Sequence, residues 1–154
     1  MKNEEFLTLL KIPKEFIDNS MIDMPEIGGK VRRFIRAKET PVDFILDITR
    51  GRINEVNITY FIRQDNQNKK LLRLDITDKL HINPDGEHIR APHIHLADEG
   101  WDLKWAYPLD NAKVKHIFSN RDDMIALLQD LLKYFTVENI PLIVLQSNIF
   151  SKKW

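Results

Sequence analysis

The fold is decided by one stretch of this sequence, LLRLDITDKLHINPDGEHIRAPHIHL, residues 71–96. Its centre, Asn83-Pro84-Asp85-Gly86, has the chemistry of a tight turn: proline fixes φ, aspartate suits the third position, and glycine accepts a left-handed conformation. The pattern predicts a three-residue hairpin loop in which Asn83 pairs with Glu87. In a straight hairpin, the numbers of opposed residues then sum to 170.

This register agrees with the apolar pattern of the flanking strands. It sets apolar residues against each other on one face, in the pairs Leu74–Leu96 and Ile76–Ile94. It sets polar residues against each other on the other face, in the pairs Asp75–His95 and Thr77–His93. Nothing in the turn requires this agreement, so it supports the register. Pro92 cannot donate to a ladder, and a bulge there would shift the pairing beyond it by one residue.

Strand-like segments precede the hairpin from about residue 30. Residues 42–49 and 54–62 alternate apolar and polar side chains, the pattern of half-buried strands. A short turn at residues 50–52 is expected to join them. The expected apolar pairs across that turn are Leu46–Val56 and Phe44–Ile58.

Helical patterns lie at the two ends of the chain. Residues 3–11 predict a short helix capped by Asn3. A longer helix is predicted at about 120–135, with Ser119 or Asn120 as cap. Its apolar stripe has helical spacing and is expected to face the core; it consists of Met124, Leu127, Leu128, Leu131 and Phe135. The tail PLIVLQSNIF fits either a last strand or a buried extended segment.

These patterns predict an α+β fold, an antiparallel meander of five or six strands with helices on one face. Its 154 residues fit a single domain, 1–154. Cysteine is absent, which excludes thiol catalysis and disulfides. The formal net charge is zero, so any surface that attracts nucleic acid must be local. With no signal peptide and no apolar run of membrane-spanning length, we expect a soluble cytoplasmic protein without membrane contact.

The polar side of the hairpin is the predicted functional site. His93 and His95 point the same way, roughly 6–7 Å apart. Asp75 is expected to orient His95, with Arg73 beside it. His81 has the right parity, but in a straight hairpin it lies roughly 13 Å from His93 and is expected outside the site.

The segment downstream, EGWDLKWAYPL, adds further candidates. The residues predicted to do chemistry are Asp75, His93, His95 and Lys104. Those predicted to contact a ligand are Arg73, Trp101, Trp105 and Tyr107.

Three joined patterns carry a resemblance to known proteins: H-x-N-P-D-G at residues 81–86, P-H-I-H at 92–95 and E-G-x-x-x-K-W-A-Y-P-L at 99–109. Together they resemble an uncharacterised family of small bacterial proteins that prophages and other mobile elements also carry. The resemblance spans about residues 44–109. It implies a mobile-element setting and no particular activity. Members favour an aromatic residue soon after the second histidine, where this chain has Leu96-Ala97.

Three functional hypotheses follow, and the sequence alone does not decide between an enzyme and a binding protein. In the first, a mobile-element accessory protein binds a nucleic-acid or nucleoprotein partner, or a host protein, through the polar sheet face and so inhibits or modulates host machinery. In the second, a small phosphodiesterase or ribonuclease uses His93 and His95, with or without a metal. In the third, His93 and His95 bind a divalent metal ion, with Asp75 either as a third ligand or as the carboxylate that orients one of the imidazoles.

Overall fold

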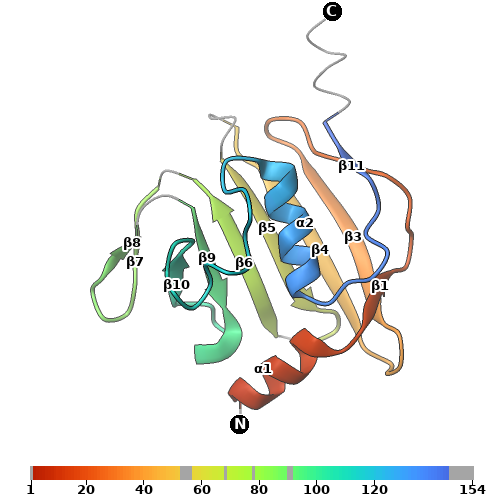
Figure 1. Cartoon of the computed structure of the whole chain (residues 1–154), viewed down its shortest axis with the longest axis horizontal. Helices are drawn as coiled ribbons and strands as arrows, with labels where there is room; N and C mark the ends of the chain where they lie inside the picture. Colours follow the sequence, from red (N-terminus) through yellow and green to blue (C-terminus); the bar gives the residue numbers. More distant parts are fainter. Residues whose placement is uncertain (1, 53–56, 68, 78, 90–91, 146–154) are drawn as a thin grey trace, which may run out of the picture.

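The computed structural model describes residues 2–145 except 53–56, 68, 78 and 90–91. Its centre is a seven-stranded antiparallel sheet in the order β1-β3-β4-β5-β6-β9-β10 (Figure 1). The strands are β1 (Lys14–Phe16), β3 (Lys30–Ala37), β4 (Asp43–Arg50), β5 (Ile58–Gln64), β6 (Lys70–Ile76), β9 (His93–Leu96) and β10 (Ala106–Pro108). The predicted α+β meander is confirmed, with seven strands in place of five or six.

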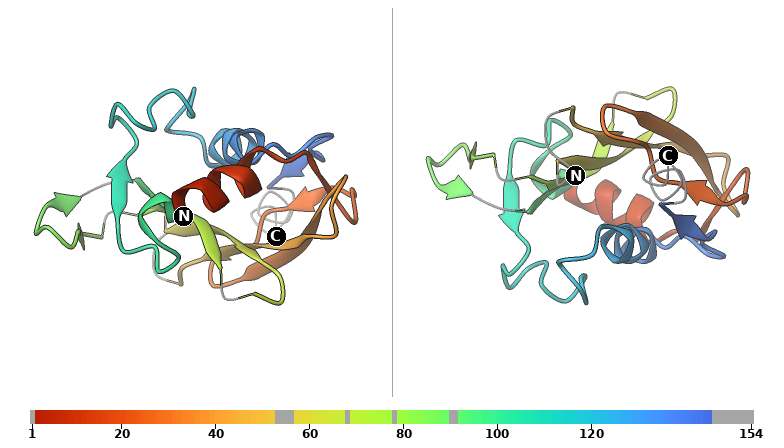
Figure 2. Two further views of the ribbon diagram at one scale, coloured as in Figure 1. Left: turned by 90° about the horizontal axis from the view of Figure 1, so that it is seen from below. Right: turned by 90° about the horizontal axis from the view of Figure 1, so that it is seen from above.

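Helices α1 (Lys2–Lys11) and α2 (Met124–Tyr134) cover one side of this sheet (Figure 2). Short elements complete the fold: a 3-10 turn, η1 (Ala97–Glu99), and two small sheets. In one small sheet, β2 (Ile22–Asp23) pairs in parallel with β11 (Ile143–Val144), so the first part of the tail is a strand. In the other, β7 (His81–Ile82) pairs with β8 (His88–Ile89). Residues 146–150 of the tail lie outside the described residues.

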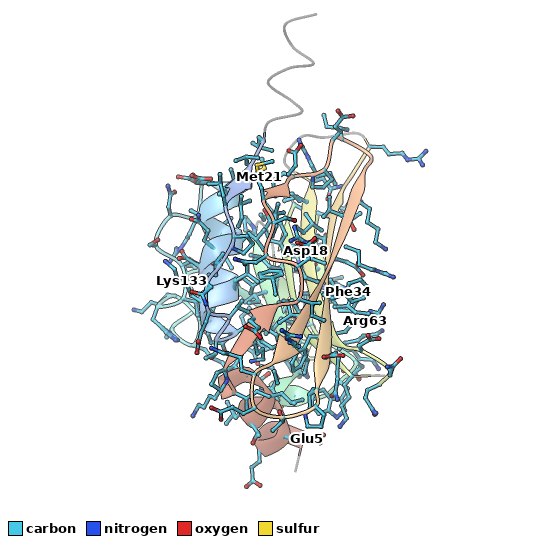
Figure 3. All side chains as sticks on the ribbon, turned by 90° about the vertical axis from the view of Figure 1, so that its right-hand side faces the viewer. Glu5, Asp18, Met21, Phe34, Arg63 and Lys133 are labelled. Atoms are coloured by element: carbon cyan, nitrogen blue, oxygen red, sulfur yellow. The ribbon has the colours of Figure 1, made fainter. Side chains whose placement is uncertain are left out.

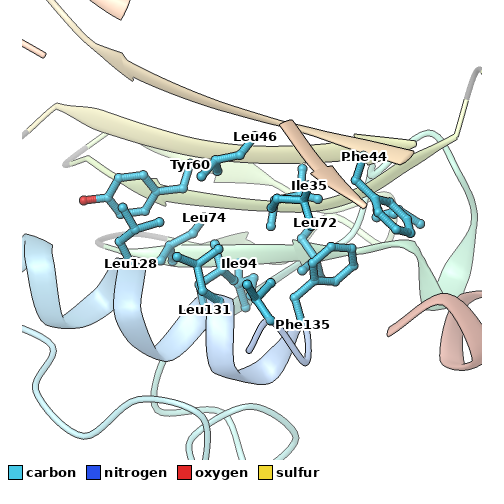
Figure 4. Packing of buried hydrophobic residues seen from close by; sticks show 14 of the residues in the cluster. Ile35, Phe44, Leu46, Tyr60, Leu72, Leu74, Ile94, Leu128, Leu131 and Phe135 are labelled. Carbon is cyan, nitrogen blue, oxygen red and sulfur yellow. The ribbon is translucent and has the colours of Figure 1, made fainter. Parts of the chain in front are cut away.

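The core lies between α2 and the sheet (Figure 4). The predicted stripe is confirmed as a core face: Leu127, Leu128 and Leu131 are buried, and Phe135 meets Phe44 edge to face at 5.0 Å. Each fully buried leucine contributes about 1.5–3 kcal/mol. The capping residue is Asp123, whose side chain accepts hydrogen bonds from two amides of the first turn. The helix therefore begins at Met124, later than the predicted 120.

The predicted pairing of β4 with β5 is wrong by an even number of residues. Leu46 lies opposite Ile62, and Phe44 opposite Gln64. β4 continues through Arg50 and β5 begins only at Ile58, so the connection between them is longer than three residues. Arg50 is buried, and its guanidinium donates to the carbonyl oxygen of Pro25 at 3.1 Å. Val56 lies outside the described residues. The inward-facing parity is as predicted, because one face of both strands is buried.

The turn at residues 83–86 is confirmed, and the ladder beyond it differs. The amide of Asn83 donates to Glu87 O at 2.9 Å, and Gly86 has φ 89°. On β6 and β9, however, Asp75 lies opposite His93 and Arg73 opposite His95. The predicted pairs Asp75–His95, Thr77–His93, Leu74–Leu96 and Ile76–Ile94 are therefore wrong by two residues.

The shift has a simple origin in the lengths of the two connections. Six residue steps separate Asp75 from His81, whereas four separate Ile89 from His93. The difference of two is the register shift. Consequently β7–β8 forms its own small sheet and does not continue the ladder of β6 and β9.

In the described part of the chain, no helix has the length and apolarity needed to cross a membrane.

Candidate functional site

Two rows of residues cross the polar side of the sheet, away from the helices. Figure 3 shows this side, with Phe34 and Arg63 pointing away from α2. The register aligns the first row, which is Lys30, Thr49, Thr59, Asp75 and His93. It also aligns the second row, which is Arg32, Asp47, Phe61, Arg73 and His95. Adjacent strands lie about 4.8 Å apart, so neighbours along each row can contact one another.

The carboxylate of Asp75 is the centre of the site. Its Oδ2 lies 3.1 Å from Nε2 of His93, 3.3 Å from Nε2 of His95 and 3.1 Å from Nε of Arg73. Its Oδ1 accepts a hydrogen bond from the Thr59 hydroxyl at 3.0 Å. Asp75 thus contacts both histidines, although only His93 lies directly opposite it.

Electrostatics keep Asp75 ionised and His95 neutral. Burial acts to raise the pKa of Asp75, but the hydrogen bond from His93 and the charge of Arg73 outweigh it and hold the pKa well below its usual range. His95 is fully buried, and this burial lowers its pKa although Asp75 lies close by.

The tautomer of His95 follows from its second ring nitrogen. Nδ1 lies 2.7 Å from the carbonyl oxygen of Leu103, which can only accept, so Nδ1 carries the proton. Nε2 is then an acceptor, and Nη2 of Arg73 donates to it at 3.2 Å. The unprotonated Nε2 faces the Asp75 carboxylate, 3.3 Å from its Oδ2.

The prediction that His81 lies outside the site is wrong. Its ring centre is 4.8 Å from that of His95 and 5.6 Å from that of His93. Its Nε2 lies 3.0 Å from the carbonyl oxygen of Lys104. The distance of roughly 13 Å assumed a straight hairpin, whereas β7–β8 departs from the ladder of β6 and β9 (Figure 1).

Asn83, the first residue of the turn, ties this hairpin to β10. Its side-chain amide donates to Ala106 O at 3.0 Å, and its side-chain oxygen accepts from Ala106 N at 2.8 Å. The residue is only 5% exposed. The turn sequence therefore serves a second purpose, because its asparagine pairs with a strand far along the chain.

A pocket of about 370 Å³ opens onto this cluster. Among the residues that line it are Thr59, Arg73, Asp75, His81 and His93. His95 is fully buried and does not line the pocket. In the sequence, the only signal that His81 belongs to the site is the parity that it shares with His93.

A groove of about 500 Å³ adjoins the pocket, and Thr59 and Arg73 line both. Two carboxylates, Asp47 and Asp102, lie in the groove; Asp47 accepts from Arg32 at 2.7 Å. Five basic side chains also line it, namely Lys30, Arg32, Arg63, Lys70 and Arg73. Because they come from β3, β5 and β6, the sequence shows no basic run, and Lys30, Arg63 and Lys70 were missed.

The other predicted site residues lie elsewhere. The Lys104 side chain is 70% exposed, 3.9 Å from Asp102. Trp101 packs against the core, and Trp105 is half-buried. Tyr107 lies opposite Ile94, which places it on the helix-covered face. None of these four side chains lines the pocket or the groove.

Asp75, His93 and His95 are arranged compatibly with a metal site. One ligand atom from each lies within 4.8 Å of the other two. Two imidazoles and one carboxylate form a known ligand set for transition metals. The bond from His95 Nδ1 to a backbone carbonyl is the kind of support that orients a metal-binding imidazole.

Comparisons with known proteins give one result. No curated protein and no solved structure matches the chain. A family model of unknown function, DUF6978, matches residues 1–137, which confirms the predicted membership of an uncharacterised family. The chain therefore belongs to the family of unknown function DUF6978.

Proposed function

We propose that the protein binds nucleic acid along the polar face of its sheet. The observation that carries the proposal is the groove, which gathers five cations on a chain of zero net charge. Local basic surfaces attract the phosphate backbone whatever the net charge of the chain.

The groove also offers an apolar surface to bases. Phe61 lines it, and Phe34, 44% exposed, lies on the same side of the sheet (Figure 3). Aromatic rings beside a cationic track are typical of proteins that bind single strands, because bases stack on the rings. These phenylalanines take the place proposed above for Trp101 and Trp105.

The test measures binding of fluorescent single-stranded RNA, single-stranded DNA and duplex DNA by anisotropy over a range of salt concentrations. The double variant Arg63→Gln/Lys70→Gln removes two groove cations. We expect about tenfold weaker binding and a shallower salt dependence, by roughly 1.5–2 in the logarithmic slope. The control, Lys11→Gln/Lys133→Gln, removes two exposed cations from the helices and should bind normally. Equal binding by both double variants would refute the proposal, and a lack of binding to all three probes would favour a host protein as partner.

This activity suits the mobile-element setting that the family resemblance implies. In our proposal, the protein is a cytoplasmic accessory factor that binds host nucleic acid or nucleoprotein and thereby modulates host machinery. Recovery of nucleic acid crosslinked to the protein in cells would identify the sequences bound.

We also propose that Asp75, His93 and His95 hold a divalent transition-metal ion. Ligand atoms around such an ion, at bond lengths near 2.1 Å, lie roughly 3 Å apart. The distances of 3.1 and 3.3 Å from Asp75 Oδ2 to the two imidazoles fit that spacing. Both histidines converge on one carboxylate instead of flanking a phosphate, so the ribonuclease hypothesis is favoured in its metal-assisted form.

The metal proposal is tested by the metal content of protein dialysed against zinc, manganese or cobalt. We expect about one ion per chain in the wild type and none in His93→Ala or Asp75→Asn. His116→Ala, outside the cluster, is the control. Labelled RNA incubated with and without chelator shows in the same samples whether binding leads to cleavage. Equal metal content in all the variants would contradict the proposed site.

A further inference from the structure

The rings of His81, His93 and His95 form a nearly equilateral triangle. The distances between ring centres are 4.8, 5.1 and 5.6 Å. Imidazoles that share one ion through bonds of about 2.0–2.1 Å have ring centres roughly 5 Å apart. We propose that His81 is the third imidazole ligand of this site, which gives it three nitrogens and one oxygen, a ligand set that suits zinc and its neighbours in the first transition row. The inference rests on the metal proposal above.

Two consecutive carbonyls orient two of these rings. Leu103 O accepts from Nδ1 of His95, and Lys104 O lies 3.0 Å from Nε2 of His81. A carbonyl requires a proton on the nitrogen that faces it, so in the neutral ring of His81 the lone pair lies on Nδ1, as in that of His95 it lies on Nε2. Each ring thus has one nitrogen that can offer a lone pair to a cation, and in His95 this nitrogen accepts from Arg73 when no ion is bound. For His95 this arrangement is typical of a metal-binding histidine, with one nitrogen held by the protein and the other facing the Asp75 carboxylate. His81 would complete the site by turning its Nδ1 toward the ligand atoms of Asp75, His93 and His95, which lie within 4.8 Å of one another.

The segment that provides these carbonyls is constrained. Leu103 is buried and has φ 53°, a left-handed conformation that is unfavourable for leucine. Such strain is maintained where surrounding contacts require it, and it is common at functional sites. Here the strained residue supplies the carbonyl that fixes His95.

The hairpin holds His81 against the other two rings. Asn83, two residues further on, is tied to the backbone of Ala106 by two hydrogen bonds. Ala106 in turn lies opposite His95 in the sheet. His81 therefore has a short, hydrogen-bonded connection to the strand that carries His95.

The ligand set determines the kind of metal. Magnesium and calcium prefer oxygen ligands, whereas three imidazoles and one carboxylate suit zinc and its neighbours in the first transition row. Lys79 and Arg73 also line the pocket, so an anion that reaches the ion would meet positive charge there.

The experiment compares His81→Ala with His88→Ala. Both histidines lie on the same hairpin, but His88 is exposed and is no member of the ring triangle. Zinc affinity is measured by competition with a chromophoric chelator, and cobalt is added as a spectroscopic probe of the ligand set. We expect His81→Ala to bind zinc about 10–100-fold more weakly and to change the shape of the cobalt absorption bands. His88→Ala should behave as the wild type.

Each outcome separates the two proposals. If His93→Ala abolishes zinc binding while His81→Ala equals His88→Ala, the metal site stands and the role of His81 is refuted. If the wild type binds neither zinc nor cobalt, the metal proposal itself fails. Circular dichroism of each variant verifies folding, and His81→Gln serves as a milder second substitution if His81→Ala is unstable.

Discussion

The guanidinium of Arg73 donates from Nη2 to Nε2 of His95 at 3.2 Å, at the nitrogen that would otherwise face a metal ion. The same guanidinium contacts Asp75 through Nε at 3.1 Å. Arg73 therefore supplies the positive charge beside Asp75, His93 and His95 when no ion is bound. It also lines both the pocket and the groove.

Replacing Arg73 by methionine should weaken the proposed nucleic-acid binding and strengthen the proposed zinc binding. Nucleic-acid affinity should fall by about 3–10-fold, because one groove cation is lost. Zinc affinity should rise by a similar factor, because a competing positive charge leaves the ligands. Anisotropy and chelator competition on the same preparation measure both. A parallel loss of the two affinities would show that Arg73 supports the structure of the site instead of competing with the ion.

Asn83→Ala should disconnect the hairpin from β10. The substitution leaves both backbone groups of Ala106 without their side-chain partner, at a cost of about 1–3 kcal/mol in unfolding free energy. Under the zinc proposal, it should also weaken zinc binding although His81 itself is intact. Urea unfolding and zinc competition measure the two effects. Asp85→Ala, in the exposed part of the same turn, is the matched control. Unchanged zinc affinity in Asn83→Ala would show that the position of the β7–β8 hairpin does not affect zinc binding.

Lys14→Met should destabilise the protein without changing the site. Lys14 is fully buried, and its Nζ donates to the carbonyl oxygens of Leu10, Ile12 and Phe135 at 3.0, 2.9 and 2.6 Å. Methionine has a similar shape but no donor, so three carbonyls lose the lysine donor, and of these Leu10 O keeps a bond from the Thr136 hydroxyl at 2.8 Å. We expect a loss of about 2–4 kcal/mol in urea unfolding. Lys38→Met, at an exposed ion pair with Glu138, should have little effect. An unchanged midpoint in Lys14→Met would mean that water satisfies these carbonyls.

In metal-free protein, acidification should reduce stability from about pH 6.5 downward. An unfolded histidine takes up a proton near 6.5, whereas burial lowers the pKa of His95 in the folded state. Between the two values the unfolded chain binds more protons, so the free energy of unfolding falls as the pH falls. Asp75 acts in the same sense at lower pH: its folded pKa lies below 3.8, so the stability it provides above that pH is lost as the pH drops through the folded value.

Urea unfolding between pH 7.5 and 4.5, with chelator present, measures this dependence. His95→Asn removes the titrating group and keeps a donor for Leu103 O, so its profile should be flatter. Parallel profiles for the wild type and His95→Asn would show that other groups cause the loss.

The sequence predicted which residues face which side of the sheet, because one face is buried and the alternation has a period of two. It could not predict how far each strand slides. Leu46 pairs with Ile62 instead of Val56, and Asp75 with His93 instead of His95; both errors are even-numbered. Such errors preserve every inward and outward assignment. The offset between two paired strands depends on the length of the chain that connects them. The alternation of apolar and polar residues carries no information on that length.

The candidate site was predicted in part for the same reason. Asp75, His93, His95 and Arg73 were identified because one hairpin brings β6 and β9 together. His81 was excluded by assuming a straight hairpin, whereas β7 and β8 form a sheet of their own outside the ladder of β6 and β9. Arg63 and Lys70 were not identified because no local sequence pattern brings them together with Arg73. Only the pairing of the strands places all three in one groove.

The β7–β8 hairpin interrupts the chain between two strands that are neighbours in the sheet. The ladder of β6 with β9 needs no residue of this hairpin, whereas His81 depends on it entirely. Selection could therefore lengthen, shorten or rewrite this arm with little disturbance of the scaffold beneath it. Three of the four proposed ligands thus belong to the strands of the sheet and the fourth to the arm, so the fourth ligand could change without a new architecture.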